Sequence, residues 1–176
     1  QGVETSPSPQ RKSLTVIPDE VTFQQAALAH LCAIPMVGVR HARIRLGERV
    51  AIFGQGLIGQ FSQQLTTING AGTIIAVDLW DHRLEVAQKH GATHVVNAAR
   101  EDVLETITTL TDGHGADVVL EATGNPAVIN DALKAAARRG RVVLVGSPRG
   151  PVEIDPYSDI HRPGVTVIGA HMGNAG

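Results

Sequence analysis

Short apolar runs alternate with longer amphipathic stretches along most of the chain, starting near Gly47. The runs are rich in Val and Ile, which is typical of strands buried on both faces of a sheet. Strands that alternate with helices predict right-handed βαβ units around a parallel sheet. The pattern therefore predicts an α/β fold, a doubly wound, parallel six-stranded sheet with helices on both faces. The expected strands are Arg49–Phe53, Thr73–Val77, His94–Val96, Asp117–Leu120, Arg141–Val145 and Val165–Ile168.

Four of the stretches between these runs repeat their apolar residues at helical spacing. We expect each helix to bury this face against the sheet. Gly140 follows the last stretch where a helix C-terminal glycine is expected, just before the next strand. The four apolar faces are Leu57, Ile58, Phe61, Leu65 and Ile68; Leu84, Val86 and Ala87; Val103, Leu104, Ile107 and Leu110; and Val128, Ile129, Ala132, Leu133 and Ala136.

The region before the first strand predicts a tail followed by a broken helix. Residues 1–16 are small, polar and proline-bearing, which favours a flexible tail or linker. Asp19 or Thr22 is the candidate N-cap of a first helix. Pro35 is expected to interrupt that helix, because proline has no N–H to donate, and a second short helix is expected over Met36–Ala42.

The composition suits one globular domain, which we place at residues 17–176. The 176 residues are 43% hydrophobic but only 3% aromatic, so aliphatic side chains must fill the core. The formal net charge is −2 and no basic cluster occurs, which argues against a nucleic-acid partner. The one cysteine, Cys32, cannot form an internal disulfide, so we expect a cytoplasmic protein. No apolar run approaches the roughly 20 residues of a membrane helix, so no membrane partner is expected.

The sequence RVAIFGQGLIGQ places a Gly-x-Gly-x-x-Gly motif between an expected strand and an expected helix. In this context Gly54 permits a sharp turn, Gly56 lets a pyrophosphate approach the backbone, and Gly59 lets the helix pack closely on the strand. The N–H groups near Leu57 and Ile58 would face the phosphates at the positive end of the helix. The alternative is a tight strand–helix turn without a ligand. The motif favours a Rossmann-type dinucleotide-binding domain.

The second expected strand ends at Asp78, about 20 residues after the glycines, where a carboxylate accepts hydrogen bonds from the adenosine ribose. The same carboxylate would repel a 2′-phosphate, and the next residue is the uncharged Leu79. Both points favour NAD over NADP. Two alternatives remain open: Asp78 caps the following helix, and Arg83 tolerates a phosphate instead of stacking beside the adenine.

Two further strand ends are expected to line the nicotinamide half of the site. Thr123 and Gly124 follow the fourth strand, and Val145 and Gly146 follow the fifth. In a doubly wound sheet, ligands bind beyond the carboxyl ends of the strands. The alternative is that these glycines only make ordinary turns.

The chain shows no residues of its own for metal binding or catalysis. Its eight histidines include no His-Glu-x-x-His spacing, and one cysteine excludes a Cys-rich zinc site. No Gly-x-Ser-x-Gly motif provides a hydrolase nucleophile. We therefore assign no catalytic and no metal-ligating residue to this chain.

These residues resemble the medium-chain dehydrogenase/reductase family, of the zinc-type alcohol, sorbitol and threonine dehydrogenase kind. The run Arg83-Leu84-x-x-Ala87-x-x-x-Gly91-Ala92 is more specific than the glycines, and the likeness extends from about Ile17 to Gly173. The matching stretches are GERVAIFGQGLIGQ, AVDLWDHRLEVAQKHGATHVVNA, DGHGADVVLEATGNPAVINDALKAAARRGRVVLVG and VTVIGAH.

The resemblance implies a second, GroES-like catalytic domain that brings the zinc ligands and most of the substrate pocket, and whose early cysteine and Gly-His-Glu motifs do not occur in this sequence. It implies an NAD-dependent, zinc-dependent parent that oxidises a secondary alcohol of a polyol, sugar or amino acid by hydride transfer, while this chain alone is inactive. It adds Ala170 at the nicotinamide. It also implies a homodimer through an edge strand at Pro151–Pro156.

Two other functions remain as alternatives. The first is a stand-alone NAD(H)-binding or sensing module without catalysis. The second is a zinc-independent reductase that uses NADPH, which the carboxylate of Asp78 disfavours.

Overall fold

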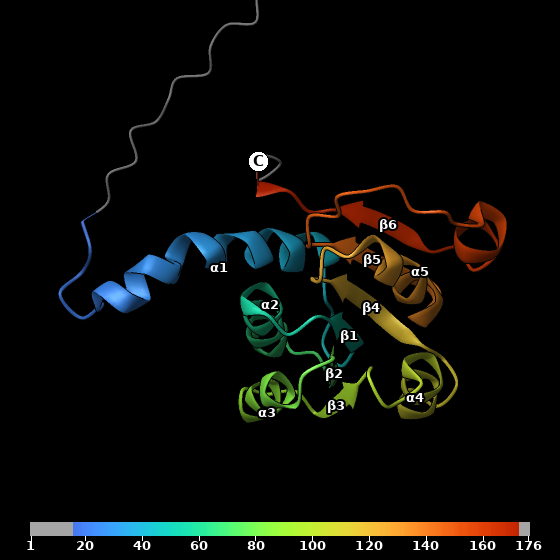
Figure 1. The fold of residues 1–176 in the computed structure, drawn as a ribbon, viewed down its shortest axis with the longest axis horizontal. Helices are drawn as coiled ribbons and strands as arrows, with labels where there is room; N and C mark the ends of the chain where they lie inside the picture. Colours follow the sequence, from blue (N-terminus) through green and yellow to red (C-terminus); the bar gives the residue numbers. More distant parts are fainter. Residues whose placement is uncertain (1–15, 173–176) are drawn as a thin grey trace, which may run out of the picture.

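The computed structural model describes residues 16–172, and in these residues six parallel strands form one sheet in the order β3-β2-β1-β4-β5-β6 (Figure 1). The predicted tail at residues 1–16 lies almost wholly outside the described residues. The predicted six-stranded, doubly wound sheet is confirmed. The strands are β1 Arg49–Phe53, β2 Thr73–Asp78, β3 His94–Asn97, β4 Ala116–Glu121, β5 Ala136–Leu144 and β6 Thr166–Gly169. The helices are α1 Phe23–Ala42, α2 Leu57–Ile68, α3 Asp81–Lys89, α4 Val103–Leu110, α5 Pro126–Ala135 and the π-helix η1 Pro156–His161.

The core consists of two layers because successive strand residues point to opposite faces of the sheet. Val50 and Ile52 of β1 belong to the cluster that includes residues of α1 and α3. Ala51 and Phe53, one position along, belong to the cluster that includes residues of α4 and α5. Helices therefore cover both faces, and the strands between them read as nearly continuous apolar runs.

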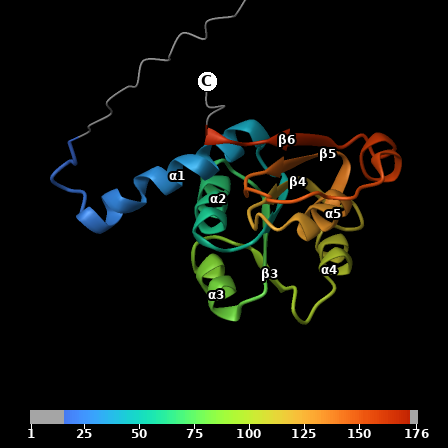
Figure 2. The same ribbon diagram turned by 45° about the horizontal axis from the view of Figure 1, so that its top comes forward.

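The N-terminal helix corrects the prediction of a break at Pro35. Helix α1 runs without interruption from Phe23 to Ala42, and Pro35 lies inside it. The capping box of Thr22 with Gln25 starts the helix, so Thr22 and not Asp19 is the N-cap. The buried residues of α1 begin at Pro35 and continue to Ala42, where the helix packs on the sheet. This packing offsets the hydrogen bond that proline removes. The first half of α1 extends beyond the sheet (Figure 2).

The structure also corrects the prediction at Gly140. Helix α5 ends at Ala135, and Gly140 lies inside β5 and does not end a helix. The β4–β5 pairing passes from Ala116↔Ala136 to Val118↔Arg141, so β5 contains an irregular bend at this place. A Cβ on Gly140 would lie 2.7 Å from the carbonyl oxygen of Ala137, which explains why glycine occupies the bend.

The predicted edge strand Pro151–Pro156 is wrong for this sheet. Residues 151–155 form no strand, and η1 begins at Pro156 after Asp155 caps it through the N–H groups of Tyr157 and Ser158. Strand β6 forms this edge of the sheet instead, paired with β5. Proline at both ends of the segment and the cap at Asp155 favour a turn over an extended strand. None of the helices in residues 16–172 is long and apolar enough to cross a membrane.

Candidate functional site

The glycine loop joins β1 to α2 at the carboxyl edge of the sheet. Gly54 has a φ of +88°, which glycine adopts readily, and its N–H donates to the carbonyl oxygen of Val77 at 2.8 Å. A Cβ on Gly59 would lie 1.8 Å from the carbonyl oxygen of Gly54, so the helix packs directly on the loop. A Cβ on Gly56 would meet nothing within 4 Å. The first and third glycines are therefore required by packing, and the second faces open space.

The start of α2 provides free hydrogen-bond donors beside that space. The helix begins at Leu57, and its N-cap Gly56 has no side chain to accept from the first turn. Helix geometry leaves the N–H groups of Leu57, Ile58 and Gly59 without an acceptor inside the helix. Gln60 is the first residue to donate back, to the carbonyl oxygen of Gly56 at 2.9 Å. These donors and the helix dipole make the loop suitable for an anionic group such as a pyrophosphate.

Asp78 ends β2 and its carboxylate is held in place across the loop. One oxygen, Oδ2, accepts from the backbone N–H of Gln55 at 2.6 Å, and Oδ1 accepts from the N–H groups of Leu79 and Trp80 at 2.8 and 3.0 Å. The guanidinium of Arg83 lies 3.5 Å from Oδ2. The side chain is 4% exposed. Helix α3 starts later, with Trp80 as its N-cap and no side-chain cap, so the alternative role of Asp78 as the cap of that helix is wrong.

A first cleft of about 420 Å³ opens between the glycine loop and the ends of β2 and β4. Its polar rim includes Asp78 and Arg83, and Trp80 stands on the same rim with 57% of its surface exposed. Its floor is apolar, which suits a flat aromatic base. The lining residues include Gly54, Gly56, Asp78, Leu79, Arg83 and Thr123, all of them sequence candidates, together with Phe53, Val77, Ala98, Val103 and Val128.

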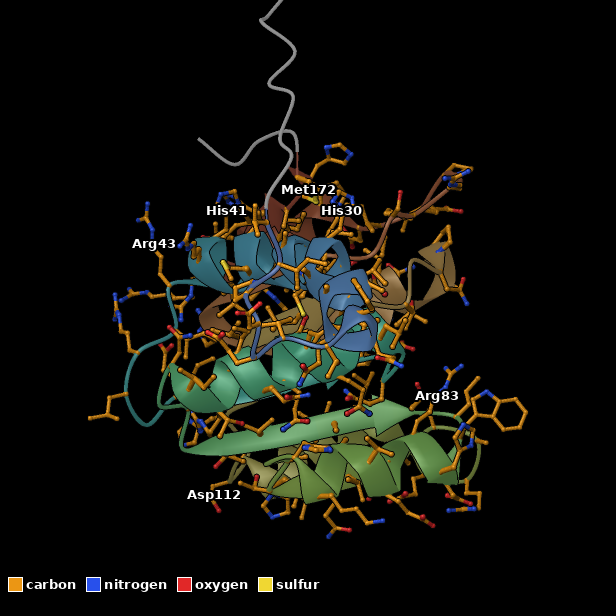
Figure 3. The ribbon with its side chains drawn as sticks, turned by 90° about the vertical axis from the view of Figure 1, so that its left-hand side faces the viewer. His30, His41, Arg43, Arg83, Asp112 and Met172 are labelled. Carbon is orange, nitrogen blue, oxygen red and sulfur yellow. The ribbon has the colours of Figure 1, made fainter. Side chains whose placement is uncertain are left out.

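A second, wider groove of about 900 Å³ lies along the ends of β4, β5 and β6. Ala122 and Thr123 line both the cleft and the groove, so the two make one crevice along the carboxyl edge. Helix α1 forms a wall of the groove through His30 and Ile34, and Figure 3 shows His30 near Met172, well apart from Arg83. The sequence candidates in this groove are Ile58, Thr123, Gly124, Val145, Gly146 and Ala170.

Two residues predicted from the sequence to bind the cofactor line neither the cleft nor the groove. Gly59 lies behind the loop, where it allows close packing. The side chain of Leu57 is 56% exposed at the first position of α2. Each still belongs to the first turn of the helix, so its contribution would come from a backbone N–H and not from a side chain.

The structure adds residues that the sequence reasoning missed. Trp80 follows the end of β2 by two positions, and that spacing could have identified it. His30, by contrast, reaches the groove only because α1 continues through Pro35, and no local pattern signals this. Glu121, the last residue of β4, is fully buried directly beneath the Thr123–Gly124 turn.

An ion pair connects the start of α3 to the turn after β3. The guanidinium of Arg100 donates to the carboxylate of Asp81 at 2.7 and 2.8 Å, and the amide of Asn97 donates to it at 2.7 Å. These hydrogen bonds, chiefly that from Arg100, lower the pKa of Asp81 to about 2. The first turn of α3 is thereby tied to the end of β3, beside Trp80.

The side chains described in residues 16–172 do not provide a metal centre. No group of three His, Cys, Asp or Glu in this part of the chain is placed to hold a metal ion. The residues present therefore do not fit a zinc ion, whereas the open Gly56 and the fixed Asp78 fit a dinucleotide.

The chain matches the family model described as zinc-binding dehydrogenase over residues 58–176. It is 38% identical over 133 residues to sorbitol dehydrogenase of Bacillus subtilis (strain 168), a match that covers 76% of this chain and 38% of that protein. It superimposes on the crystal structure of 2R,3R-butanediol dehydrogenase from Bacillus subtilis with a TM-score of 0.79 and 34% identity, covering 87% of this chain and 44% of the other.

A third match bears on the cofactor. A putative zinc-binding dehydrogenase from Sinorhizobium meliloti 1021, solved bound to NADP, gives a TM-score of 0.75 at 34% identity over 79% of this chain and 42% of that one. The chain thus spans less than half the length of these relatives.

Proposed function

Since the chain belongs to the zinc-binding dehydrogenase family of medium-chain dehydrogenases, we propose that it is the NAD-binding part of an enzyme that oxidises a secondary alcohol. The observation that carries this proposal is the pairing of the open backbone at Gly56 with the fixed carboxylate of Asp78 in one cleft. Phosphates need the first feature and a ribose diol needs the second. No packing contact requires a glycine at position 56.

Different residues of the crevice bind the different parts of the cofactor. Asp78 accepts hydrogen bonds from the hydroxyls of the adenosine ribose, and Leu79, Trp80 and Arg83 surround the adenine. Gly54, Gly56 and the first turn of α2 bind the pyrophosphate. The turns after β4, β5 and β6 enclose the nicotinamide, through Thr123, Gly124, Val145, Gly146 and Ala170.

The preference for NAD rests on the charges around Asp78. Its carboxylate is fixed by three backbone N–H groups, so it cannot turn away from a 2′-phosphate. Arg83 is 3.5 Å from that carboxylate, which offsets part of its positive charge. A phosphate at this position would meet net repulsion and NADP would bind less tightly. Since one relative was solved bound to NADP, titration with both cofactors measures this preference directly.

The nicotinamide of a bound NAD would supply the acceptor for a hydride from the alcohol carbon, and the residues of this chain would orient that ring and shield it from water. No step is assigned to zinc, because no zinc site is formed by the described residues. Sorbitol and butanediol, named in two relatives, both carry secondary hydroxyls, which supports a polyol, sugar or amino-acid alcohol as the substrate of the whole protein.

Parallel calorimetric titrations with NADH and NADPH test the proposal. We expect NADH to bind about tenfold more tightly or better, a difference of about 1.4 kcal/mol. Asp78→Ala should weaken NADH binding and narrow this difference, while Asp117→Asn, a carboxylate change at the opposite edge of the sheet, should alter neither affinity. Equal affinities for the two cofactors before and after the Asp78 change would remove Asp78 from the proposed site.

A homodimer and a cytoplasmic location stay predictions. Light scattering coupled to size-exclusion chromatography at high concentration tests the first, and a result of monomer alone would count against it.

A further inference from the structure

Glu121 is a fully buried carboxylate at the carboxyl end of β4, in the part of the sheet where the crevice opens. Its Oε1 accepts from the backbone N–H groups of Thr123 and Gly124 at 2.7 and 3.1 Å, and also from the hydroxyl of Thr123. Its Oε2 is buried and has no hydrogen-bond partner among the described residues. One oxygen therefore organises a turn, and the other is left unsatisfied.

The same residue also fixes the neighbouring turn through its backbone. The carbonyl oxygen of Glu121 accepts from the N–H groups of Val145 and Gly146 at 2.8 and 2.7 Å. A Cβ on Gly146 would lie 2.4 Å from the nitrogen of Gly124 and 2.9 Å from Oε2 of Glu121. The turns after β4 and β5 thus pack against each other with Glu121 between them and leave no space for another side chain.

The turn needs an acceptor oxygen at this reach and does not need a charge. A buried carboxylate is costly to desolvate, and an unpartnered buried oxygen adds to that cost. A neutral side chain with one acceptor oxygen would satisfy the same three donors without a buried charge.

The turns that Glu121 holds form the wall of the wide groove. Thr123, Gly124, Val145 and Gly146 all line it. Gly124 has a φ of +68°, so the turn is held in a conformation that most residues avoid. The adenine end of the crevice, around Trp80 and Asp78, receives no hydrogen bond from Glu121. Loss of the acceptor oxygen at this reach should therefore disturb the nicotinamide end of the crevice more than the adenine end, which only Thr123 of these four residues also lines.

We propose that Glu121 is a positioning residue that holds the Thr123–Gly124 turn in the shape that orders the nicotinamide end of the cofactor. The inference rests on the proposed function, since it presumes a dinucleotide in the crevice. Glu121 acts through the reach of its acceptor oxygen and not through its charge.

Two fluorescence signals, one from each end of the cofactor, test this in the chain as it stands. Trp80 is the only tryptophan of the sequence and stands on the rim of the adenine cleft, so its emission reports the binding of ADP-ribose, which has no nicotinamide. The emission of the reduced nicotinamide of NADH reports the other end. Glu121→Gln keeps the reach of the acceptor and removes the charge, whereas Glu121→Asp keeps the charge and shortens the reach.

We expect Glu121→Gln to behave like the unchanged chain in both titrations. Glu121→Asp should bind ADP-ribose as before but lose most of the rise in nicotinamide emission and bind NADH about tenfold more weakly. If Glu121→Asp does not fold, as judged by its thermal unfolding, Thr123→Val serves instead. It removes the hydroxyl that donates to Glu121 and should shift the nicotinamide signal in the same direction.

Several outcomes would overturn the inference. One is a normal rise in nicotinamide emission in Glu121→Asp, and another is the absence of that rise in a folded Glu121→Gln. A third is an equal loss of ADP-ribose and NADH binding in Glu121→Asp. An unchanged chain that binds ADP-ribose but never alters nicotinamide emission also overturns it. An unchanged chain that binds neither ligand refutes the proposed function itself, which separates the two failures.

Discussion

The polar groups at the two edges of the sheet differ in how far they have hydrogen-bond partners. At the amino edge, Arg49 donates to both carboxylate oxygens of Asp117 at 2.9 Å and to the carbonyl oxygen of Thr111 at 3.0 Å. Arg141 pairs with Glu48 across the same edge at 2.5 Å. At the carboxyl edge, the first turn of α2 has no side-chain cap and an oxygen of Glu121 has no partner among the described residues.

This difference indicates which edge stabilises the fold and which edge can bind. The charges at the amino edge pair with each other and with backbone groups, and Nε of Arg141 is the one buried polar atom of these pairs without a partner among the described residues, so they have little left to offer a ligand. Donors and acceptors without partners at the carboxyl edge are costly in the folded chain unless water or a ligand satisfies them. Substitutions at the amino edge should therefore alter stability alone, and those at the crevice should alter binding. Substitutions in the glycine loop can alter both.

Gly59→Ala should have the largest effect. The new methyl group would lie 1.8 Å from the carbonyl oxygen of Gly54, a backbone atom that cannot move without displacing α2 from β1. Overpacking of this kind costs about 3 kcal/mol or more, so a large drop in the urea midpoint should accompany the loss of NADH binding. A variant with normal stability would show that the loop and helix are not in close contact.

Gly56→Ala tests the comparison more closely because it adds the same methyl group at the preceding glycine of the motif, three residues away. Nothing lies within 4 Å of the new Cβ, so the free energy of unfolding should fall by no more than about 1 kcal/mol, the cost of alanine at the N-cap of α2. NADH binding should fall about tenfold or more, because the methyl group would occupy the space of the pyrophosphate. Calorimetry beside urea unfolding measures both effects. Unchanged affinity would mean that no phosphate approaches Gly56.

The glycine pair also shows how far the sequence could predict the structure. The loop can be identified from the motif together with the apolar strand before it and the helix after it, because each glycine is required for a different geometric reason. Asp78 was predictable for the same reason, since its spacing from the glycines follows from the length of one βα unit. Strand positions were predictable because burial on both faces leaves long aliphatic runs.

The errors occurred where tertiary packing overrides a local signal. Pro35 predicted a helix break, but the burial of the residues that follow it keeps α1 continuous. The sequence predicts a helix end at Gly140, whereas this glycine permits a bend in β5 that only the pairing with β4 explains. Glu121 had no local signal at all, because its role depends on turns that follow two different strands.

Asp117→Asn should have a smaller effect, confined to stability. The carboxylate binds Arg49 through two oxygens with about a quarter of each side chain exposed, so loss of the charge should cost about 1 kcal/mol after screening by solvent. The affinity for NADH should not change, because the pair lies at the opposite edge from the crevice. Urea unfolding and calorimetry on the same sample check both statements. A clear loss of affinity would contradict the separation of the two edges.

The smallest expected effect is the pH dependence of the stability difference between the unchanged chain and Asp117→Asn. Hydrogen bonds from Arg49 hold the pKa of Asp117 below its usual value of 3.8, despite the opposing effect of burial. A carboxyl group with a lowered folded-state pKa stabilises the fold above its unfolded pKa, and this contribution is lost as the pH falls through the folded-state value. The stability gap between the unchanged chain and Asp117→Asn should therefore be constant near neutrality and shrink as the pH falls below about 4. Asp81, with its pKa near 2, loses its own contribution in both proteins and cancels in the comparison. A gap that stays constant down to strongly acidic pH would show that packing, not the ion pair, makes Asp117 contribute to stability at the amino edge.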